Sequence, residues 1–125
     1  MRVILLCFLL FSGQVAAKVD VEKTMKDMAF QYKQAKDAND SATMLPALLE
    51  LSRLAEIALQ GDYQPEQAAD FRHGLEQVLM ALQRATDAAR NQDMAEAKSQ
   101  LHQVDQLRKQ YHDKRKVSIW QLLFG

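Results

Sequence analysis

The sequence predicts an all-α protein, an antiparallel four-helix bundle whose helices run up, down, up and down. Apolar and small residues recur at helical spacing along the chain, and no stretch alternates as a strand does. Turn and cap residues divide this pattern into four segments of about 17 to 26 residues joined by short loops, which place consecutive helices antiparallel. At 125 residues the chain has room for one domain with one core.

The first helix is expected over about residues 19–38, and the turn at residues 39–41, Asn-Asp-Ser, ends it. Thr43 is the expected N-cap of the second helix, because Pro46 then falls in the first turn, where its missing N–H costs nothing. Gly61 fits a position just beyond the end of that helix. The apolar stripes of the two helices are Val21, Met25, Met28, Tyr32 and Ala35, and Leu48, Leu51, Leu54, Ala55 and Ala58.

The third helix is expected to open at Pro65, with Glu66 well placed against its dipole, and to end at Asn91. Asp93 then caps the fourth helix, and Glu96 would complete a reciprocal capping box with it. The stripe of the third helix is Phe71, Leu75, Val78, Leu82, Ala85 and Ala89. That of the fourth is Met94, Ala97, Leu101, Val104, Arg108 and Tyr111, and this helix is expected to end near residue 116.

Residues 1–17 have the pattern of a cleaved export signal. Arg2 gives a positive start, residues 3–11 are apolar, and the small residues of Val15-Ala16-Ala17 precede the expected cleavage site. The apolar run is too short to span a bilayer, which takes about 20 residues. An uncleaved anchor or a buried helix is the alternative. Cys7 lies inside the run without the small preceding residue that a lipoprotein signal requires.

The charge balance excludes one class of partner. Residues 1–17 contain one of the 16 basic residues, Arg2, and none of the 16 acidic ones, so residues 18–125 hold 15 basic and 16 acidic residues and a net charge of −1. Nucleic-acid-binding proteins usually have a basic face or stripe. We therefore expect no nucleic acid among the partners.

Three stretches far apart in the sequence are predicted to meet at one end of the bundle. They are Met25, the run Asp-Phe-Arg-His-Gly at 70–74, and Tyr111-His112. At 1.5 Å per residue, Met25 lies about 9 Å from residue 19 and His112 about 6 Å from residue 116. In an antiparallel bundle both offsets start at the same end, where Leu54 and Phe71 share the layer. A thioether, an imidazole and apolar walls together indicate a haem slot.

In these residues the chain resembles soluble cytochrome b562, a family of small periplasmic four-helix haem proteins. The resemblance covers about residues 19–115, and the 70–74 run and the Tyr-His pair are its most specific parts. It implies that Met25 and His112 are the axial iron ligands and that Phe71 packs against the macrocycle. Leu75 departs from the family, in which phenylalanine is common, and a leucine fills the pocket less.

The resemblance implies a periplasmic electron carrier rather than an enzyme, with one haem b per chain. Residues 18–125 contain no cysteine, so the haem would be held without thioether bonds. With a Met/His pair on the iron, no open position remains for O₂ chemistry. Arg108 or Arg115 would neutralise a haem propionate, unless both are ordinary surface arginines. A monomer with unidentified redox partner proteins is expected.

The histidines allow other interpretations. His73 is expected to face solvent. Asp70 and His73 resemble half of a di-iron site, but such a site needs a second carboxylate-x-x-His copy. Ser99 and Lys109 stand where the acids of a second copy would be, three residues before His102 and His112. A haem-free helical bundle that binds a partner or acts as a chaperone in the same compartment is the alternative function.

Residues 117–125 form an apolar tail beyond the family resemblance. The basic residues 114–116 precede Ile119, Trp120 and the run 122–124, Leu-Leu-Phe. We expect this tail to fold back onto the haem end of the bundle. Contact with a membrane or a partner, supported by the basic residues, is the less favoured alternative.

Overall fold

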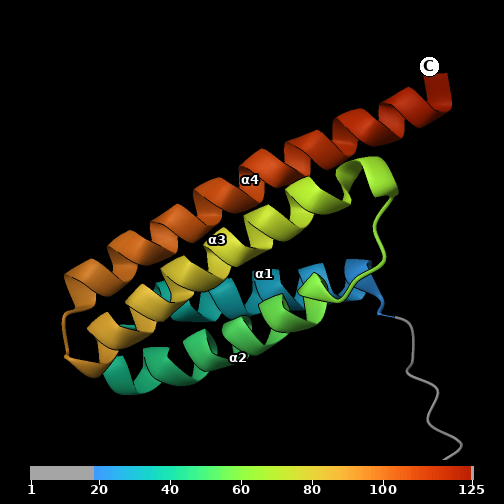
Figure 1. Ribbon diagram of the computed structural model, residues 1–125. Coiled ribbons are helices and arrows are strands. Elements are labelled where there is room, and N and C mark those ends of the chain that lie inside the picture. The colour runs from blue at the N-terminus through green and yellow to red at the C-terminus, as the bar shows by residue number, and fades with distance from the viewer. Residues whose placement is uncertain (1–18, 125) are drawn as a thin grey trace, which may run out of the picture.

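The computed structural model describes residues 19–124, and the surroundings of the side chains over residues 19–111. It contains α1 (Val21–Asp37), α2 (Ser41–Leu59), α3 (Pro65–Arg90) and α4 (Met94–Phe124). Figure 1 shows these four helices in up-down-up-down order, with the α1–α2 and α3–α4 loops at one end of the bundle. The predicted all-α four-helix bundle is confirmed.

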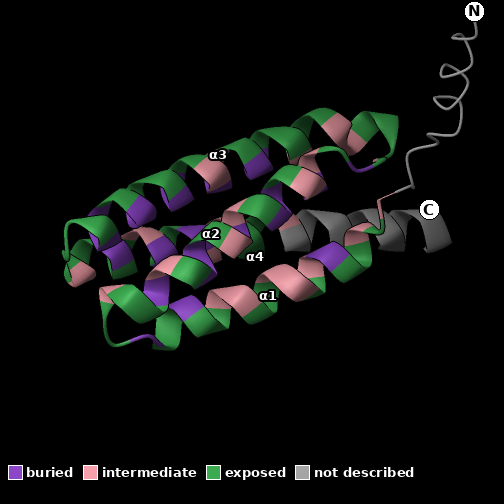
Figure 2. Ribbon diagram, turned by 90° about the horizontal axis from the view of Figure 1, so that it is seen from below, coloured by how far each residue is buried: buried purple, intermediate pink, exposed green. Residues whose placement is uncertain are grey.

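The hydrophobic core is concentrated in the half of the bundle that holds those two loops. Its largest fully buried side chains are Met44, Leu48, Leu51, Leu82 and Leu101. Alanines fill much of the remaining core, and these small side chains let the helices approach closely. Consecutive helices pack along their lengths, whereas α1 and α4 make few contacts with each other. Figure 2 shows the buried residues on the inner faces of the helices.

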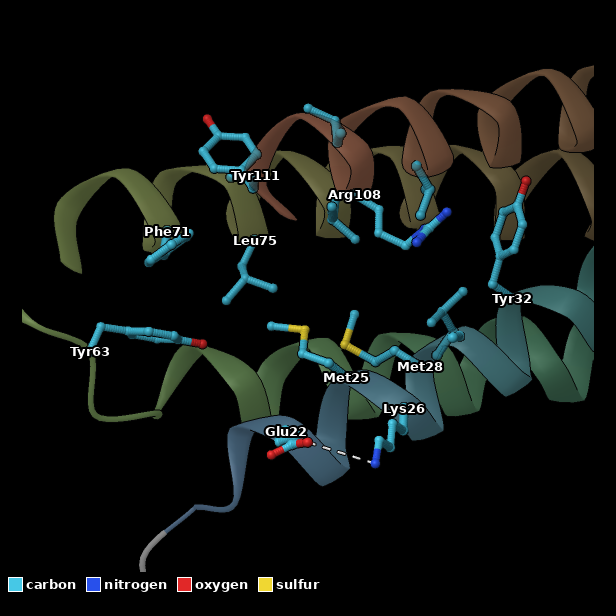
Figure 3. Close-up of a pocket in the computed structure, with 16 residues that line it drawn as sticks. Glu22, Met25, Lys26, Met28, Tyr32, Tyr63, Phe71, Leu75, Arg108 and Tyr111 are labelled. Carbon is cyan, nitrogen blue, oxygen red and sulfur yellow. Dashed lines mark ion pairs between the residues drawn. The ribbon is translucent and has the colours of Figure 1, made fainter. Parts of the chain in front are cut away.

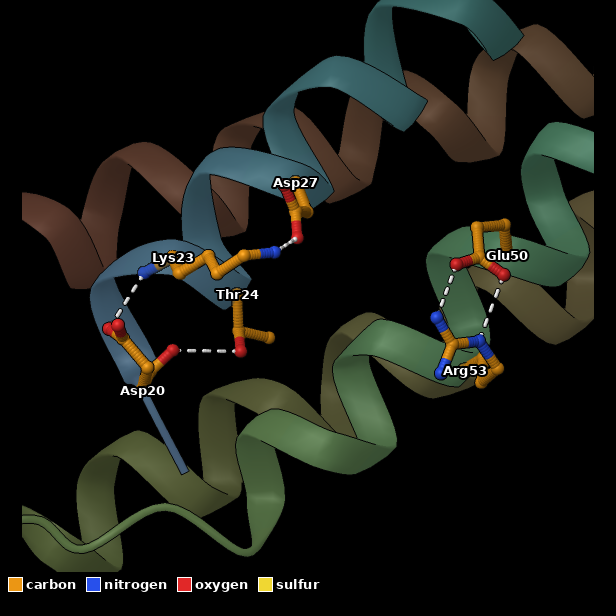
Figure 4. A network of polar contacts seen from close by, with 6 residues as sticks. All are labelled: Asp20, Lys23, Thr24, Asp27, Glu50 and Arg53. Carbon is orange, nitrogen blue, oxygen red and sulfur yellow. Dashed lines mark hydrogen bonds and ion pairs between the residues drawn. The ribbon is translucent and has the colours of Figure 1, made fainter. Parts of the chain in front are cut away.

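The first helix begins slightly later than its apolar pattern predicts. The Asp20 carboxylate accepts the backbone N–H of Lys23 at 3.0 Å and so caps α1. Thr24 donates its hydroxyl to the Asp20 carbonyl at 2.9 Å, and the Lys23 ammonium lies 2.8 Å from Asp27 (Figure 4). On α2, Arg53 pairs with Glu50 one turn earlier. The two ion pairs are surface contacts, whereas Thr24 is buried.

The N-cap of α2 is Asp40, so the prediction of Thr43 was wrong. The Asp40 carboxylate accepts the backbone N–H of Thr43 at 2.8 Å, which makes Thr43 the third helical residue. This hydrogen bond holds the pKa of Asp40 below its ordinary value. Because the helix starts at Ser41, Pro46 lies inside it rather than in its first turn. Pro46 therefore leaves one helix carbonyl without its usual donor.

Gly61 follows the C-cap residue Gln60, as predicted, but not in a left-handed conformation. A Cβ atom there would lie 2.7 Å from Val21 Cγ2 and 3.1 Å from the Ala58 carbonyl oxygen. The close approach of the start of α1 to the end of α2 thus explains this glycine.

The boundaries of α3 and the start of α4 follow the prediction in part. Pro65 opens α3, Asn91 is its C-cap, and the Asp93 carboxylate accepts the Glu96 backbone N–H at 3.1 Å. The reciprocal half of the expected capping box is not formed, because the Asp93 N–H donates to the Ala88 carbonyl. The Glu96 carboxylate instead accepts from Gln100.

The fourth helix is longer than predicted. It was expected to end near residue 116, but α4 continues without a turn to Phe124. The predicted fold-back of residues 117–125 needs a turn, so that prediction was wrong. A folded-back tail would also have placed Trp120 near the haem. The side chain of Trp120 lies outside the part of the chain whose side-chain surroundings are described. Within the described residues no helix is both long enough and apolar enough to cross a membrane.

Candidate functional site

A cavity of about 610 Å³ opens between α1 and α4, in the half of the bundle away from the main core. Its volume is in the range of sites that bind small molecules and cofactors. Most of its lining is apolar or aromatic (Figure 3). The lining residues are Glu22, Met25, Lys26, Met28, Ala29, Tyr32, Leu51, Tyr63, Phe71, Gly74, Leu75, Val78, Val104, Leu107, Arg108 and Tyr111.

The α1 wall carries two thioethers. Met25 and Met28 lie three residues apart on one face of the helix, and Figure 3 shows both side chains directed into the cavity. The small side chain of Ala29 adds little bulk beside them. Tyr32 lies one turn farther along α1, and burial raises the pKa of its phenol. This wall therefore offers soft sulfur atoms in an apolar setting.

The opposite wall is built from aromatic rings on α3, α4 and the α2–α3 loop. The ring centroids of Tyr63 and Phe71 are 5.3 Å apart, and those of Phe71 and Tyr111 are 6.5 Å apart. Tyr63 is anchored by its hydroxyl, which donates to the Ala58 carbonyl at 2.8 Å. The tilted arrangement of the three rings gives a rigid apolar surface.

Gly74 allows the wall to close. A Cβ atom at this position would lie 2.7 Å from the ring of Tyr111, closer than side-chain contacts permit. The absence of a side chain therefore lets the Tyr111 ring pack directly on α3. Close helix approach therefore explains a glycine in the interior of α3.

Charged side chains lie at the edge of the cavity. On α4 the Arg108 guanidinium donates to the Asp105 carboxylate at 2.9 and 3.1 Å, and the Lys109 ammonium lies 3.1 Å from the same group. Burial alone would raise the pKa of Asp105, but these two cations hold it below its ordinary value. On α1, Lys26 lies 3.7 Å from Glu22. Cations thus line the cavity from both helices.

The structure brings most of the predicted site residues together. Met25, Phe71, Leu75 and Arg108 all line the cavity. Leu54 is buried but does not line it, and Leu51, one turn earlier on α2, does. Leu51 rather than Leu54 therefore lines the cavity together with Phe71.

The position of His112 is given by its helix alone. It follows Tyr111 in α4 and lies one turn after Arg108, and both of these line the cavity. Its side chain and that of Arg115 lie outside the part of the chain whose side-chain surroundings are described. The height of His112 was predicted from a helix end near residue 116, and that premise was wrong because α4 continues to Phe124. The segment of α4 that holds His112 is related to Met25 through the cavity, because Arg108, Tyr111 and Met25 all line it.

The other histidines lie on the surface. His73 is exposed, as predicted, and its Nε2 lies 2.9 Å from the Gln77 amide nitrogen. His102 is also exposed. Among the described residues, no three histidine, cysteine, aspartate or glutamate side chains form a group that could hold a metal ion.

Several lining residues were not singled out from the sequence. Met28 and Tyr32 stood on the predicted stripe of the first helix, so the periodic pattern contained the signal for them. Tyr63 lies in the α2–α3 connection, where no periodicity exists to indicate its direction. Only the packing of the loop against Phe71 brings it into the wall.

Comparison with known protein families identifies the family of this chain. The sequence model of cytochrome b562 matches residues 20–116, most of the chain. The chain belongs to the cytochrome b562 family. A comparison with characterised proteins finds no match. Membership of the cytochrome b562 family suggests a haem-binding bundle that carries electrons, and it implies haem b as the cofactor. Proteins of this family are not typically enzymes.

The residues that line the cavity fit a haem group. The walls are apolar, thioether sulfur is available on α1, and cations stand at the edge where propionates need neutralisation. The lining set differs from a polar substrate site, which would carry several converging hydrogen-bond donors and acceptors.

Proposed function

We propose that the protein is a periplasmic b-type cytochrome that carries single electrons through one haem, with Met25 and His112 as axial ligands. The observation that carries this proposal is the apolar cavity between α1 and α4, lined by Met25 on one helix and by the neighbours of His112 on the other. The family match to cytochrome b562 supports it independently.

Haem bound here would supply reversible one-electron chemistry. Met25 would contribute its thioether and His112 its imidazole, a pair that favours a raised reduction potential and leaves no position for O₂. Phe71, Leu75 and Leu51 would exclude water from the macrocycle. Arg108 and Lys26 would attract propionate carboxylates at the cavity edge. Because residues 18–125 contain no cysteine, the haem would be held by these contacts alone.

An absorption spectrum of the purified protein, oxidised and reduced, is the direct test. We expect sharp low-spin α and β bands on reduction, and haem that acidified ketone extracts because no thioether bond holds it. A colourless protein that develops no such bands after haem is added would refute the proposal. It would favour the alternative, a haem-free bundle that binds a partner.

His112→Ala tests the stronger proposed ligand. We expect it to lose most of the haem affinity in a haem titration, because the imidazole is removed from the iron. His102→Ala is the matched control, since His102 is an exposed histidine on the same helix, and it should titrate as the parent does. Equal affinity of the two variants would show that His112 is not a ligand.

The periplasmic part of the proposal rests on residues 1–17, which lie outside the described structure. Cleavage of the export signal predicts a mature N-terminus at or near Lys18 and recovery of the protein in the periplasmic fraction. N-terminal sequencing of the purified protein checks both the cleavage and its site. Intact Met1 on protein from the cytoplasmic fraction would contradict export.

A further inference from the structure

Met28 gives the cavity a second thioether that the proposed function does not use. It lies three residues after Met25 on α1, and Figure 3 shows the two side chains next to each other in the cavity. Residues at this spacing on a helix are neighbours on the surface, with Cβ atoms about 5 to 6 Å apart. Both methionines are partly buried.

Met28 has open space on one side only, toward the cavity. One side of Met28 packs against the hydrophobic core and the other faces the cavity. Ala29 is the next residue and is small. A methionine side chain has three rotatable bonds and adapts to the space available. Removal of the Met25 side chain would therefore open a space that the Met28 sulfur can enter.

On this basis, and resting on the proposed haem function, we propose that Met28 is a reserve axial ligand. When the Met25 sulfur is absent, a lone pair of the Met28 sulfur is donated to the iron in its place. No proton or electron is transferred in this exchange. The bundle therefore keeps thioether ligation, which a site with a single methionine would lose.

Four variants of the full chain test this proposal after haem is added: Met25→Ala, Met28→Leu, Met25→Ala/Met28→Leu and Met25→Ala/Met80→Leu. Leucine conserves the volume of methionine but lacks sulfur. Met80 is the matched control, because it is 56% exposed on α3 and does not line the cavity. The readouts are the ferric absorption spectrum, including the sulfur-to-iron charge-transfer band, and the reduction potential. Circular dichroism establishes that each variant is helical.

We expect Met25→Ala and Met25→Ala/Met80→Leu to stay low-spin and keep the sulfur band, at a shifted wavelength. Met25→Ala/Met28→Leu should lose the band, become high-spin and have a lower potential, because a thioether ligand raises the potential of haem. Met28→Leu alone should keep the low-spin spectrum and the sulfur band, because the Met25 sulfur is still present. Alanine is the best helix-forming residue, so α1 is expected to persist in Met25→Ala.

Three results would overturn the proposal. They are a high-spin or water-bound spectrum of Met25→Ala, a complete loss of haem by that variant, and a low-spin spectrum that survives in Met25→Ala/Met28→Leu. The last would assign the sixth position to a residue other than Met28. None of these outcomes resembles failure of the proposed function, in which the parent chain itself forms no low-spin haem complex.

Discussion

Two single residues, Gly74 and Asp105, position side chains of the cavity wall. Gly74 lets the Tyr111 ring lie against α3, and Asp105 holds the Arg108 side chain at the cavity edge. Neither residue supplies a ligand. Their effects are therefore measurable on the folded protein without haem as well as with it.

The effect of Gly74→Ala on the free energy of unfolding should depend on the neighbouring Tyr111 ring. Alanine in a helix interior normally stabilises by about 1 kcal/mol relative to glycine. Here the added Cβ would meet the Tyr111 ring at 2.7 Å, so we expect a net loss of about 1 to 2 kcal/mol from overpacking. In the Tyr111→Ala background the same change should stabilise. Urea unfolding of the four proteins measures this cycle, and a stabilising Gly74→Ala in the parent would contradict the contact.

The lowered pKa of Asp105 predicts that the stability of the fold decreases at acid pH. Its folded pKa lies below the ordinary 3.8, so its contribution to stability is present above that pH and is lost as the pH falls through the folded value. The pairs with Arg108 and Lys109 are partly exposed, and we expect Asp105→Asn to cost about 0.5 to 1 kcal/mol at pH 7.

The measurement is unfolding free energy from pH 7 down to the acid limit. The difference between parent and Asp105→Asn should shrink below about pH 4. Glu76→Gln, at an exposed position on α3, is the control for the loss of one negative charge elsewhere on the bundle. A constant difference across the pH range would show that the asparagine acts through packing.

At the scale of elements, one residue inside α2 and one in the α3–α4 connection have an unfavourable backbone environment. Pro46 lies inside α2, where it removes one helix hydrogen bond. Gln92 has φ 61°, a left-handed conformation that favours glycine, and it closes a C-terminal motif in which the Asp93 N–H donates to the Ala88 carbonyl at 2.8 Å. Both positions lie in the scaffold and not in the cavity wall.

Pro46→Ala should stabilise the bundle by roughly 2 kcal/mol, because the helix regains a donor and loses the ring clash. Position 46 is exposed, so the change leaves the core unaltered. Thermal unfolding of the haem-free protein is the measurement. Pro65→Ala is the control, because a proline at the first helical position costs nothing, and the same gain there would argue against the explanation.

At the scale of the whole molecule, the bundle divides into a packed half and a hollow half. The core occupies the end with the α1–α2 and α3–α4 loops, and the cavity lies toward the other end, between α1 and α4. The core stabilises the fold while the hollow half leaves room for a cofactor. Binding to the folded state alone would then add stability.

Deletion of residues 117–125 should change the unfolding free energy by less than about 0.5 kcal/mol. The reason is that α4 continues as one helix through these residues and does not turn back onto the bundle. Urea unfolding of the truncated and full-length chains checks this. A loss of several kcal/mol would show that the tail is buried against the bundle.

The periodic apolar pattern was sufficient to predict four helices, because every amphipathic helix must bury one face. Pro65 and Asp93 located two helix starts through local chemistry. The same reasoning was wrong at Thr43, since the Asp40 carboxylate caps the helix three residues earlier. Nothing between residues 117 and 124 breaks a helix, so the apolar composition there misled the prediction of where α4 ends.

The sequence by itself determined the four helices and the residues Met25, Phe71, Leu75 and Arg108 as candidates. Only the tertiary structure decided that Leu51 rather than Leu54 lines the cavity, because both lie on the same apolar face of α2. Which of them reaches the cavity depends on the rotation of the helix. That rotation is set by the simultaneous packing of its neighbours, a long-range property that no local pattern encodes.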